Sequence, residues 1–576
     1  MYSYTTMKRI VLISAMMAII ISSIAAAQLN LDVDADFDII VINSGDWEDV
    51  YSALLSARLI GKDAFFLRSS QEIDHLIAQI GERRSILLIE PAQNRIYNNL
   101  RAFLETRGHS VTTYDHRRSI NFELFKDLDA RRAIIIDPSY GYDSISVAPY
   151  ALLTDSYVLF ARADTIGQIA DEIEDKAEHV ILYGFVDRGV SDALSKAQVE
   201  IINKESKFEN NIEIVKRFIA ESDEQIRSVK FTNGEYIEKS LFTKNNPTVF
   251  IGNTRVPRQV EEFLGNSDIA AATLIGADLA PLASSLKNTL SVRYGKDLTV
   301  MALVGKSSAA THPSQIDPLD IFPITLYSPN ISIDSIRYNQ LLKQIELTIR
   351  NNNELNVFFL SSMEIFADGE RYTFGDEDVE FIGRQRTKTL VYPAEITGEA
   401  ISGTVSIDFG GFPADFERRL LYSFDSLPTI EVIDNSEIEI LSITYDRVNK
   451  AFFVRVRNTG SVTAYVDLEL EDVIIEGKRS MLTPNANVKI EPGKKAKIAI
   501  RAELSSLDLE ENEKVMVNAY YGQRQEALFK VQKATLELKM GTHPFVYYAI
   551  IAVIVAIIVL LALGKKKRQI ESGKDL

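Results

Sequence analysis

Histidine is the first residue type to examine for chemistry, because near neutral pH it serves as a metal ligand and as a general acid or base. No His-Glu-x-x-His motif is present. The closest pair is His109 and His116, seven residues apart in loop-like surroundings, which we interpret as solvated loop histidines rather than metal ligands. The six histidines are His75, His109, His116, His179, His312 and His543.

Sequence motifs for a serine nucleophile and for a phosphate-binding loop are also missing. The chain contains no Gly-x-Ser-x-Gly elbow and no glycine-rich phosphate loop. Cysteine is absent, which excludes thiolate chemistry. The acidic run Asp32–Asp36 carries carboxylates that could bind calcium, but it lacks the glycine and the distal glutamate of a calcium loop. We therefore interpret it as a solvated linker, and we predict no catalytic residue, no metal site and no cofactor.

The turn Ser44-Gly45-Asp46-Trp47 is the best local candidate for contact with a ligand. It follows an apolar run, and open parallel sheets bind ligands at the carboxyl ends of their strands. Trp47 is the only tryptophan, and an aromatic ring near a loop can stack on a sugar. Asp46 and Trp47 are thus predicted binding residues. The alternative, which the pattern favours, is that Trp47 packs beneath the following helix as part of the core.

Arginines are concentrated between residues 83 and 132. Their planar forks suit the carboxylate or phosphate groups of an anionic polymer. We predict that Arg83, Arg84 and Arg95 bind such a polymer. The alternative is that acidic neighbours pair with the arginines and leave ordinary surface charge. The cluster consists of Arg83, Arg84, Arg95, Arg101, Arg107, Arg117, Arg118, Arg131 and Arg132, and its acidic neighbours are Glu82, Glu90, Glu105 and Asp115.

The overall composition is that of a folded protein: 25% of residues are charged and 46% are hydrophobic. The formal net charge of −17 argues against nucleic acid as a partner, because phosphate binding needs a basic footprint. Without cysteine, the domains must be stable through core burial alone. Asn330-Ile331-Ser332 is the only sequon, so Asn330 is a weak candidate for glycosylation.

The elements that would position these residues repeat along the chain. Shifted by 94 residues, Ile40–Asn43 falls on Ile134–Asp137 and Ile86–Leu88 falls on Val180–Leu182. Each unit alternates continuous apolar runs with helical patterns, which predicts parallel sheets covered on both faces. A stretch from Thr248 to about Gly305 resembles a third unit, but it aligns only with gaps.

A second repeat has a period of 107 residues. Ile331–Tyr338 falls on Ile438–Tyr445, and Arg350-Asn351 falls on Arg457-Asn458. Side chains alternate between apolar and polar, as in Phe453–Arg457, and turn signals such as Pro492-Gly493 recur. Short alternating strands over about 100 residues are typical of a β-sandwich, so we predict two in tandem.

Both ends of the chain read as membrane-directed segments. Lys8-Arg9, an apolar run to Ile24 and Ala25–Gln28 form the pattern of a secretory signal, with an uncleaved anchor as the alternative. Phe545–Gly564 is uncharged and about as long as a bilayer-spanning helix, and it is followed by Lys565–Arg568. We therefore predict a single-pass cell-membrane protein with its bulk outside the cytoplasm and its C-terminus inside.

The predicted fold class is multidomain: repeated α/β units with parallel sheets, then two tandem β-sandwiches, then one transmembrane helix. The predicted parts are a signal peptide (1–27), α/β unit 1 (28–125), α/β unit 2 (126–220), a divergent α/β unit 3 (221–325), β-sandwich 1 (326–434), β-sandwich 2 (435–542), a transmembrane helix (545–564) and a cytoplasmic tail (565–576).

The stretch from Ile39 to Leu67 resembles the opening of the cell wall-binding repeat type 2 family, in which a strand, a Gly-acidic turn and a small-residue helix lead to a second strand. The resemblance covers about residues 29–305. The chain departs from the family where Gly-Gly is expected, with Glu90-Pro91 and Gly184-Phe185, and Asp49 is followed by Val-Tyr instead of Ala-Leu. The resemblance implies contact with cell-wall or surface-layer polymer.

The predicted sandwiches resemble the adhesion-type, immunoglobulin-like modules of archaeal surface-layer proteins, through Val456–Gly460. This resemblance implies a stalk. Together the two resemblances imply a non-catalytic surface protein that mediates attachment or adhesion, with an envelope polymer or a surface-layer protein as partner. Two alternatives stay open: an exported hydrolase with an unrecognised carboxylate site, and a receptor or assembly partner of a membrane complex. The sequence leaves the oligomeric state undetermined.

Overall fold

The computed structural model describes residues 36–541, apart from short gaps at 117–118, 129, 163, 195–197, 205, 304, 308–315, 319, 325–328, 354, 398–400, 414–415 and 476–477. The described chain forms two compact units. One holds α/β elements and ends at residue 326, and the other holds the β elements that follow.

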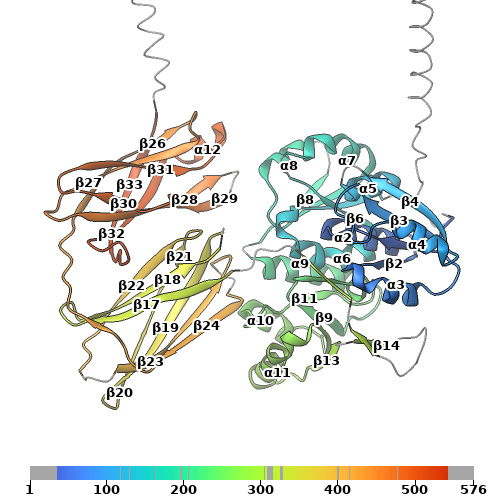
Figure 1. The fold of residues 1–576 in the computed structure, drawn as a ribbon, viewed down its shortest axis with the longest axis horizontal. Coiled ribbons are helices and arrows are strands. Elements are labelled where there is room, and N and C mark those ends of the chain that lie inside the picture. Colours follow the sequence, from blue (N-terminus) through green and yellow to red (C-terminus); the bar gives the residue numbers. More distant parts are fainter. Residues whose placement is uncertain are drawn as a thin grey trace, which may run out of the picture. The chain divides into compact units, whose positions relative to one another are not determined.

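Three four-stranded parallel sheets form the framework of the α/β unit (Figure 1). Their orders are β2-β1-β3-β4, β6-β5-β7-β8 and β11-β9-β12-β13, so each sheet places its second strand outside its first. The strands are β1 (Ile39–Ile42), β2 (Asp63–Phe66), β3 (Ser85–Pro91), β4 (Ser110–His116), β5 (Arg132–Ile136), β6 (Ser156–Phe160), β7 (His179–Tyr183), β8 (Val199–Ile202), β9 (Ser228–Thr232), β11 (Thr248–Phe250), β12 (Ala271–Ile275) and β13 (Thr299–Leu303).

Continuous apolar runs form the inner strands because helices cover both faces of the sheets. All four residues of β1 are buried, and Ile40 lies between Ala64 of β2 and Leu87 of β3 in register. The helices are α2 (Trp47–Leu59), α3 (Ile73–Ile80), α4 (Leu100–Thr106), α5 (Ile120–Asp127), α6 (Tyr142–Leu153), α7 (Ala170–Lys176), α8 (Arg188–Ala193), α9 (Lys207–Glu221), α10 (Arg258–Asn266) and α11 (Ala280–Tyr294).

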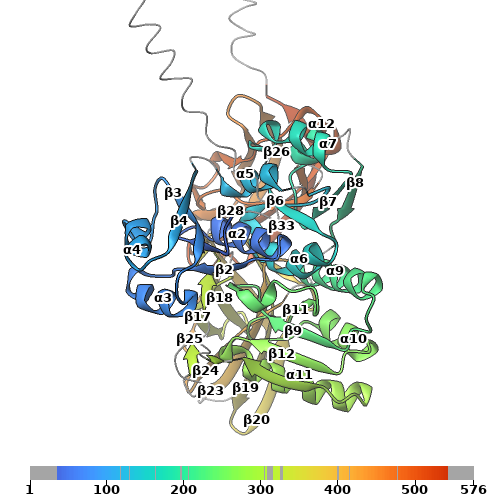
Figure 2. The ribbon, with the colours of Figure 1, turned by 90° about the vertical axis from the view of Figure 1, so that its right-hand side faces the viewer.

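Helices α2 and α6 lie side by side in the interior of the α/β unit (Figure 2). The Tyr51 hydroxyl of α2 donates to the carbonyl of Ser144 in α6 at 2.8 Å. The third sheet has no such helix after its first strand. There the chain forms β10 (Tyr236–Glu238), which pairs with β16 (Ile321–Pro323), and then the 3-10 turn η4 (Lys239–Leu241). The Phe242 ring after η4 packs on Tyr51 at 5.2 Å.

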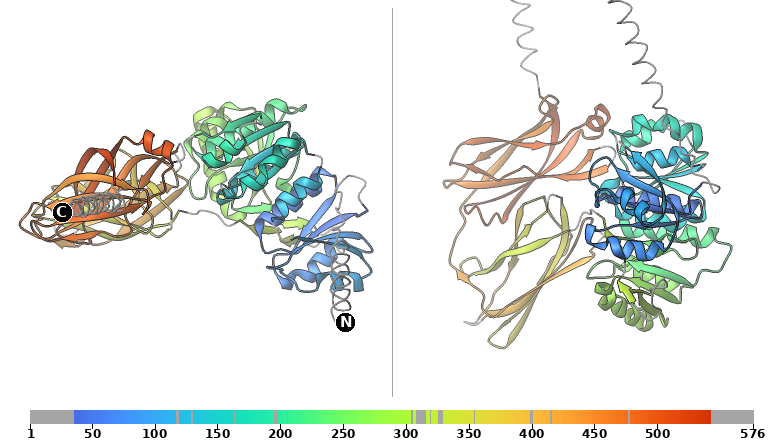
Figure 3. Two further views of the ribbon diagram at one scale, coloured as in Figure 1. Left: turned by 90° about the horizontal axis from the view of Figure 1, so that it is seen from above. Right: turned by 45° about the vertical axis from the view of Figure 1, so that its right-hand side comes forward.

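The first β domain consists of two sheets (Figure 3). Their orders are β22-β18-β17-β25 and β20-β19-β23-β24, with β21 beside β19. The buried side chains of the two sheets form one hydrophobic core. The strands are β17 (Ile331–Asn339), β18 (Gln344–Asn351), β19 (Val357–Ala367), β20 (Glu370–Gly375), β21 (Glu380–Ile382), β22 (Thr387–Pro393), β23 (Ile401–Gly410), β24 (Arg418–Phe424) and β25 (Thr429–Ile430).

The second β domain differs in that its strands form one continuous sheet, in the order β29-β28-β32-β33-β26-β27-β31 with β30 beside β28. Strand β33 makes it continuous, because it is antiparallel to β32 and parallel to β26. The elements are β26 (Ile438–Asp446), β27 (Ala451–Asn458), β28 (Ala464–Ile475), β29 (Lys478–Leu482), β30 (Val488–Ile490), β31 (Lys495–Arg501), α12 (Ser506–Glu511), β32 (Lys514–Gly522) and β33 (Lys530–Met540).

The predicted fold class is wrong in its last element, the transmembrane helix. Within residues 36–541, no helix is both long and apolar enough to cross a bilayer. The longest helices there, α9 and α11, have 15 residues, whereas a span needs about 20 apolar ones. The segments predicted as signal peptide (1–27), membrane span (545–564) and tail (565–576) lie outside the described residues. The described architecture is an α/β parallel-sheet region followed by many-stranded β domains.

Candidate functional site

The carboxyl ends of the three sheets are the first place to look for a site. In each sheet the chain leaves the first strand toward one edge and leaves the second toward a third strand on the opposite side of the first. Loops that depart in opposite directions leave a crevice between the first and third strands, and α/β proteins bind ligands at such switch points. The switch points here lie after β1 and β3, after β5 and β7, and after β9 and β12.

The switch point of the first sheet is filled by the chain's own polar groups. The Asn43 amide, after β1, donates to Glu90 of β3 at 2.9 Å and to the carbonyl of Tyr97 at 2.8 Å. The Tyr97 amide donates back to the Asn43 side chain at 2.9 Å. Arg95 lies 3.6 Å from Glu90, which is almost completely buried. This network fixes the loop after β3 over the strand ends.

The predicted contact turn, Ser44–Trp47, starts helix α2. The exposed Asp46 caps the helix by accepting a hydrogen bond from the Glu48 amide at 3.0 Å. The Trp47 side chain is buried, only 7% exposed, and packs edge-on against Phe160 with ring centroids 5.2 Å apart. The ring lies between α2 and the second sheet, so it offers no free face to a ligand. This agrees with the alternative that Trp47 is part of the core.

Glu48 is an ionisable group held in this joint. Burial is the main cause that raises its pKa to about 7, and the nearby carboxylates of Asp46 and Asp49 add to the shift. Arg162, 3.5 Å away, opposes the shift by favouring the charged form. The start of α2 thus carries a carboxyl group that changes charge near neutral pH.

The predicted arginine site is divided between two ends of strand β3. Arg83 and Arg84 directly precede β3 and are exposed, whereas Arg95 follows the strand's carboxyl end. Strand β3 has seven residues, which at about 3.3 Å each separates the two groups by roughly 20 Å. The three side chains therefore do not form one compact site.

Most other described arginines of the cluster have a local partner. Arg101 pairs with Glu105 at 2.9 Å and Arg131 pairs with Glu178 at 3.0 Å. The Arg107 guanidinium lies 5.2 Å from the Phe103 ring centroid. These contacts favour the alternative of ordinary surface charge for these residues. Arg117 and Arg118 lie outside the described residues.

His109 is not the solvated loop residue that we expected. It is buried just before β4, and its Nδ1 accepts a hydrogen bond from the Arg84 amide at 3.1 Å. Burial lowers its pKa, so the neutral ring is favoured. His109 therefore links the two turns that precede β3 and β4. Within the described residues no group of three or more His, Asp or Glu side chains could hold a metal ion.

The switch point of the second sheet contains a buried carboxyl group. Asp143, in the first turn of α6, is fully buried, and its Oδ1 has no hydrogen-bond partner among the described residues. Its equivalent in the first unit, Asp49, accepts from the Ser44 hydroxyl at 2.7 Å. Pro138 stands at the position of Ser44 in the second unit and offers no hydroxyl.

The carboxyl group of Asp143 packs directly on Gly184, where an added Cβ would lie 2.1 Å from Oδ2. Burial raises the pKa of Asp143 well above its usual value, with Lys207 acting in the opposite direction. Above this group, the Tyr140 ring from the loop after β5 packs on Phe185 from the loop after β7, at 5.7 Å. The second switch point is thus closed by aromatic rings rather than by an amide network.

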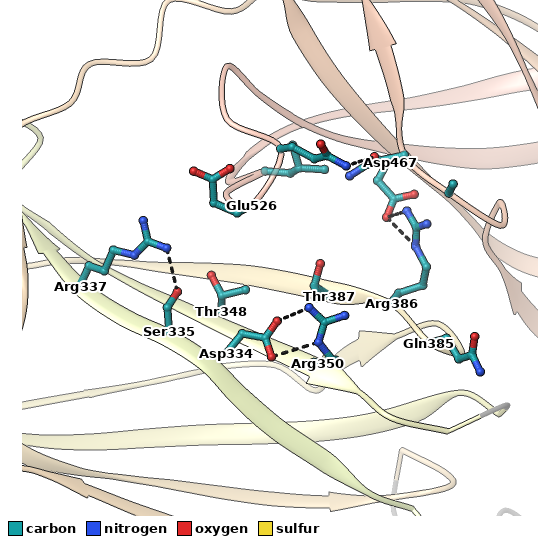
Figure 4. Close-up of a pocket in the computed structure, with 14 residues that line it drawn as sticks. Asp334, Ser335, Arg337, Thr348, Arg350, Gln385, Arg386, Thr387, Asp467 and Glu526 are labelled. Carbon is teal, nitrogen blue, oxygen red and sulfur yellow. Dashed lines mark hydrogen bonds and ion pairs between the residues drawn. The ribbon is translucent and has the colours of Figure 1, made fainter.

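The β region contains an open groove of about 610 Å³ between its two domains (Figure 4). The wall from the first β domain consists of Asp334, Ser335, Arg337, Thr348, Arg350, Gln385, Arg386 and Thr387, and the wall from the second consists of Asp467, Ala486, Asn487, Gln525, Glu526 and Leu528. Arg350 pairs with Asp334 through two hydrogen bonds, one of 3.0 Å, and Arg386 pairs with Asp467.

Two charged residues of this groove have weak or no pairing. Arg337 donates only a long hydrogen bond of 3.4 Å, to Ser335, and the exposed Glu526 carboxylate has no described partner (Figure 4). They stand on opposite walls. The sequence signal for this wall was present in the 107-residue repeat, because Arg337 falls on Thr444 and Asp334 on Leu441. Such differences between the repeats at strand positions outside the core are the sequence signal that identifies this wall.

Asn330 is exposed directly before β17, and its backbone carbonyl accepts from the Asn352 amide at 3.0 Å. The Ser332 hydroxyl of the sequon accepts from the Asn352 side chain at 3.1 Å. The amide of Asn330 is therefore in a position that a glycan could reach. Of the acidic run Asp32–Asp36, residues 32–35 lie outside the described residues, and Asp36 is exposed.

Comparisons with known proteins place the chain at a distance from characterised families. No family model matches the sequence, and no curated protein matches it. Among solved structures, the chain is similar to Cwp8 from Clostridium difficile, with a TM-score of 0.38, 12% identity, and coverage of 46% of this chain and 51% of that one. The chain thus spans about half the length of Cwp8.

The chain is also similar to the ligand binding region of serine-glutamate repeat protein A of Enterococcus faecium. The TM-score is 0.14 and the identity 17%, over 19% of this chain and 99% of that one. Red sea bream transglutaminase matches with a TM-score of 0.13 and 10% identity, over 37% of this chain and 32% of that one. TM-scores this low do not establish a common overall fold.

Proposed function

We propose that the chain is a non-catalytic, extracytoplasmic surface protein that attaches to a repetitive envelope component, either a polymer or a surface-layer protein. The α/β unit makes the attachment and the β domains act as a spacer. The proposal assigns no enzyme activity, because the polar groups at the first switch point bind one another. Ser44 donates to Asp49 and Asn43 donates to Glu90, an arrangement that holds loops in place.

The observation that carries the proposal is the threefold occurrence of one sheet topology within one compact body. A repeated topology places equivalent loops at regular intervals, which suits a ligand that itself repeats. Several weak contacts made together raise the apparent affinity by orders of magnitude through effective concentration. An enzyme gains little from such repetition, whereas an attachment protein gains avidity.

Buried hydrogen bonds join the successive repeats of the α/β region. Asn121, on α5 of the first unit, donates to the carbonyl of Val158 in the second sheet at 2.8 Å. Asn211, on α9 of the second unit, donates to the carbonyl of Thr248 in the third sheet at 2.9 Å. Three sheets connected in this way hold their exposed loops in a fixed arrangement.

Co-sedimentation with purified envelope tests the proposal. The chain from residue 36 to 541 is mixed with an isolated envelope fraction, in parallel with a chain that lacks residues 36–326. We expect the longer chain to sediment with envelope and the shorter one to stay in solution. Equal sedimentation of both chains would assign attachment to the β region, and sedimentation of neither would remove the proposal.

A further inference from the structure

The groove between the two β domains has the composition of a binding site for a hydrophilic chain. Its walls carry hydroxyl or amide side chains that both donate and accept hydrogen bonds, namely Ser335, Thr348, Thr387, Gln385, Asn487 and Gln525. Only Ala486 and Leu528 are apolar. Sugar hydroxyls also donate and accept, whereas peptide side chains usually need apolar pockets.

Some charged residues of the groove are paired with each other and others are not. The Arg350–Asp334 pair and the Arg386–Asp467 pair neutralise themselves on the walls. Arg337 is left with one long hydrogen bond, so its fork of donors is available to a planar anion such as a carboxylate. On the opposite wall, the Glu526 carboxylate is available to accept hydrogen bonds from hydroxyl groups.

The groove is held open by buried ion pairs between the domains. Arg386 and Asp467 are each only about a tenth exposed. Arg524 of the second domain pairs with the buried Glu346 of the first at 2.8 Å. Lys388 donates to the Tyr520 hydroxyl at 3.2 Å. Because these links fix the two walls relative to each other, the groove is preorganised, which lowers the entropic cost of binding.

We propose that this groove binds an acidic oligosaccharide, with the Arg337 guanidinium on a sugar carboxylate and the Glu526 carboxylate on sugar hydroxyls. This site is separate from the α/β attachment surface and does not depend on it. It makes the β region a ligand-binding module in addition to a spacer.

Isothermal titration calorimetry on the chain from residue 36 to 541 tests the site with three probes: tetragalacturonate, neutral maltotetraose and a tetra-aspartate peptide. We expect tetragalacturonate to bind and the other two to bind at least about tenfold more weakly, because a hydrogen bond to a charged group is worth roughly tenfold to hundredfold in affinity. Equal binding of the acidic peptide would show a nonspecific anion surface, and equal binding of maltotetraose would remove the role of the carboxylate. No binding of tetragalacturonate would overturn the proposal.

Variants assign the contacts. Arg337→Gln should weaken tetragalacturonate binding by about tenfold or more, and Glu526→Gln should weaken it less. Arg447→Gln, in an exposed hairpin turn of the second β domain, is the matched loss of charge and should have no effect. Melting curves confirm that each variant is folded. If Arg337→Gln and Arg447→Gln bind tetragalacturonate as tightly as the parent, the groove is not the site.

Discussion

Asn121 and Asn211 make the same three hydrogen bonds at successive joints between sheets. Each donates its amide to a serine hydroxyl, Ser52 at 3.0 Å or Ser146 at 2.8 Å. Each also donates to a carbonyl of the next sheet's edge strand, and its side-chain oxygen accepts from an amide of that strand at 2.9 Å. One asparagine side chain therefore pairs with backbone groups of an edge strand and links two successive repeats.

Removing either asparagine should destabilise the α/β unit. Asn121→Ala or Asn211→Ala leaves buried donors and acceptors without partners, which costs about 1–3 kcal/mol for each such group. We expect a loss of roughly 2–4 kcal/mol in the free energy of unfolding of this unit, measured by urea denaturation. The exposed Asn245→Ala is the control and should change stability by less than about 0.5 kcal/mol. A comparably small change in both buried variants would show that the bridges do not hold the units together.

Glu48 should make stability depend on pH. Its pKa in the folded protein, about 7, lies above the unfolded value of 4.5, so the folded state binds the proton more tightly. The resulting stabilisation is complete below pH 4.5 and is lost as the pH rises through 7. Glu48→Gln should remove this slope and should raise stability at pH 8 by up to about 3 kcal/mol.

Urea midpoints between pH 4 and pH 8 measure this effect. The exposed Glu82→Gln serves as the control and should leave the slope unchanged. If the urea midpoint of Glu48→Gln depends on pH as that of the parent does, a group other than Glu48 causes the dependence.

Breaking the ion pair between Arg386 and Asp467 should destabilise the β region, whereas replacing both residues by apolar ones should change its stability much less. Burial raises the pKa of Asp467, and Arg386 opposes that shift by favouring the charged carboxylate. Arg386→Met leaves a buried carboxyl group without its partner, which we expect to cost about 3–5 kcal/mol. The double variant Arg386→Met with Asp467→Leu should recover most of that loss, because apolar residues of similar volume replace buried ion pairs well.

A double-mutant cycle on thermal or urea unfolding of the β region measures the coupling. The exposed pair Lys343–Glu395 provides the comparison, since water and salt screen the attraction between exposed charges and such pairs contribute little to stability. Additive effects at Arg386 and Asp467 would mean that the pair does not link the two β domains.

The sequence predicted β-rich domains here because the two copies share the residues that fix strand geometry, but it did not predict the single continuous sheet of the second domain. Bulges occur at Ile333/Ser335 and at Ile440/Ser442, and both copies of the hairpin lysine, Lys343 and Lys450, have positive φ. Each of these features recurs at an offset of 107 residues. Two charged residues of the groove, Asp334 and Arg337, differ between the copies, so a search for identities could not find them.

The third α/β unit was predicted incompletely for a physical reason. Its first strand, β9, reads Ser-Val-Lys-Phe-Thr, which alternates instead of forming a continuous apolar run. The helix that follows the first strand in the other units is replaced by β10 and η4. The resemblance noted from Thr248 onward therefore begins at β11, one strand after the unit's first strand. The equivalence of Asn121 and Asn211 was also missed, because the two residues are 90 positions apart and a shift of 94 residues does not align them.

Separate arginine variants test whether the α/β unit attaches through charge, as the proposed function requires for an anionic polymer. Arg83→Gln with Arg84→Gln removes two exposed charges at the amino end of β3, and Arg95→Gln removes one at its carboxyl end. Because Arg95 lies beside the buried Glu90, its loss should lower stability by about 1–2 kcal/mol. The Arg83/Arg84 double variant should change stability by less than about 0.5 kcal/mol.

If polymer contact occurs at the amino end, only the Arg83/Arg84 variant should lose co-sedimentation with envelope, and the loss should be greatest at low salt. Exposed charges are screened over about 10 Å at 0.1 M salt, so the parent's own binding should fall toward that of the variant as salt rises. Arg131→Gln with Arg132→Gln, exposed at the start of β5, is the matched control for net charge. Equal losses of co-sedimentation in the Arg83/Arg84 and Arg131/Arg132 double variants would indicate a general charge effect. Full binding by the Arg83/Arg84 variant at low salt would exclude the amino end of the first sheet and leave attachment to uncharged surfaces of the α/β unit.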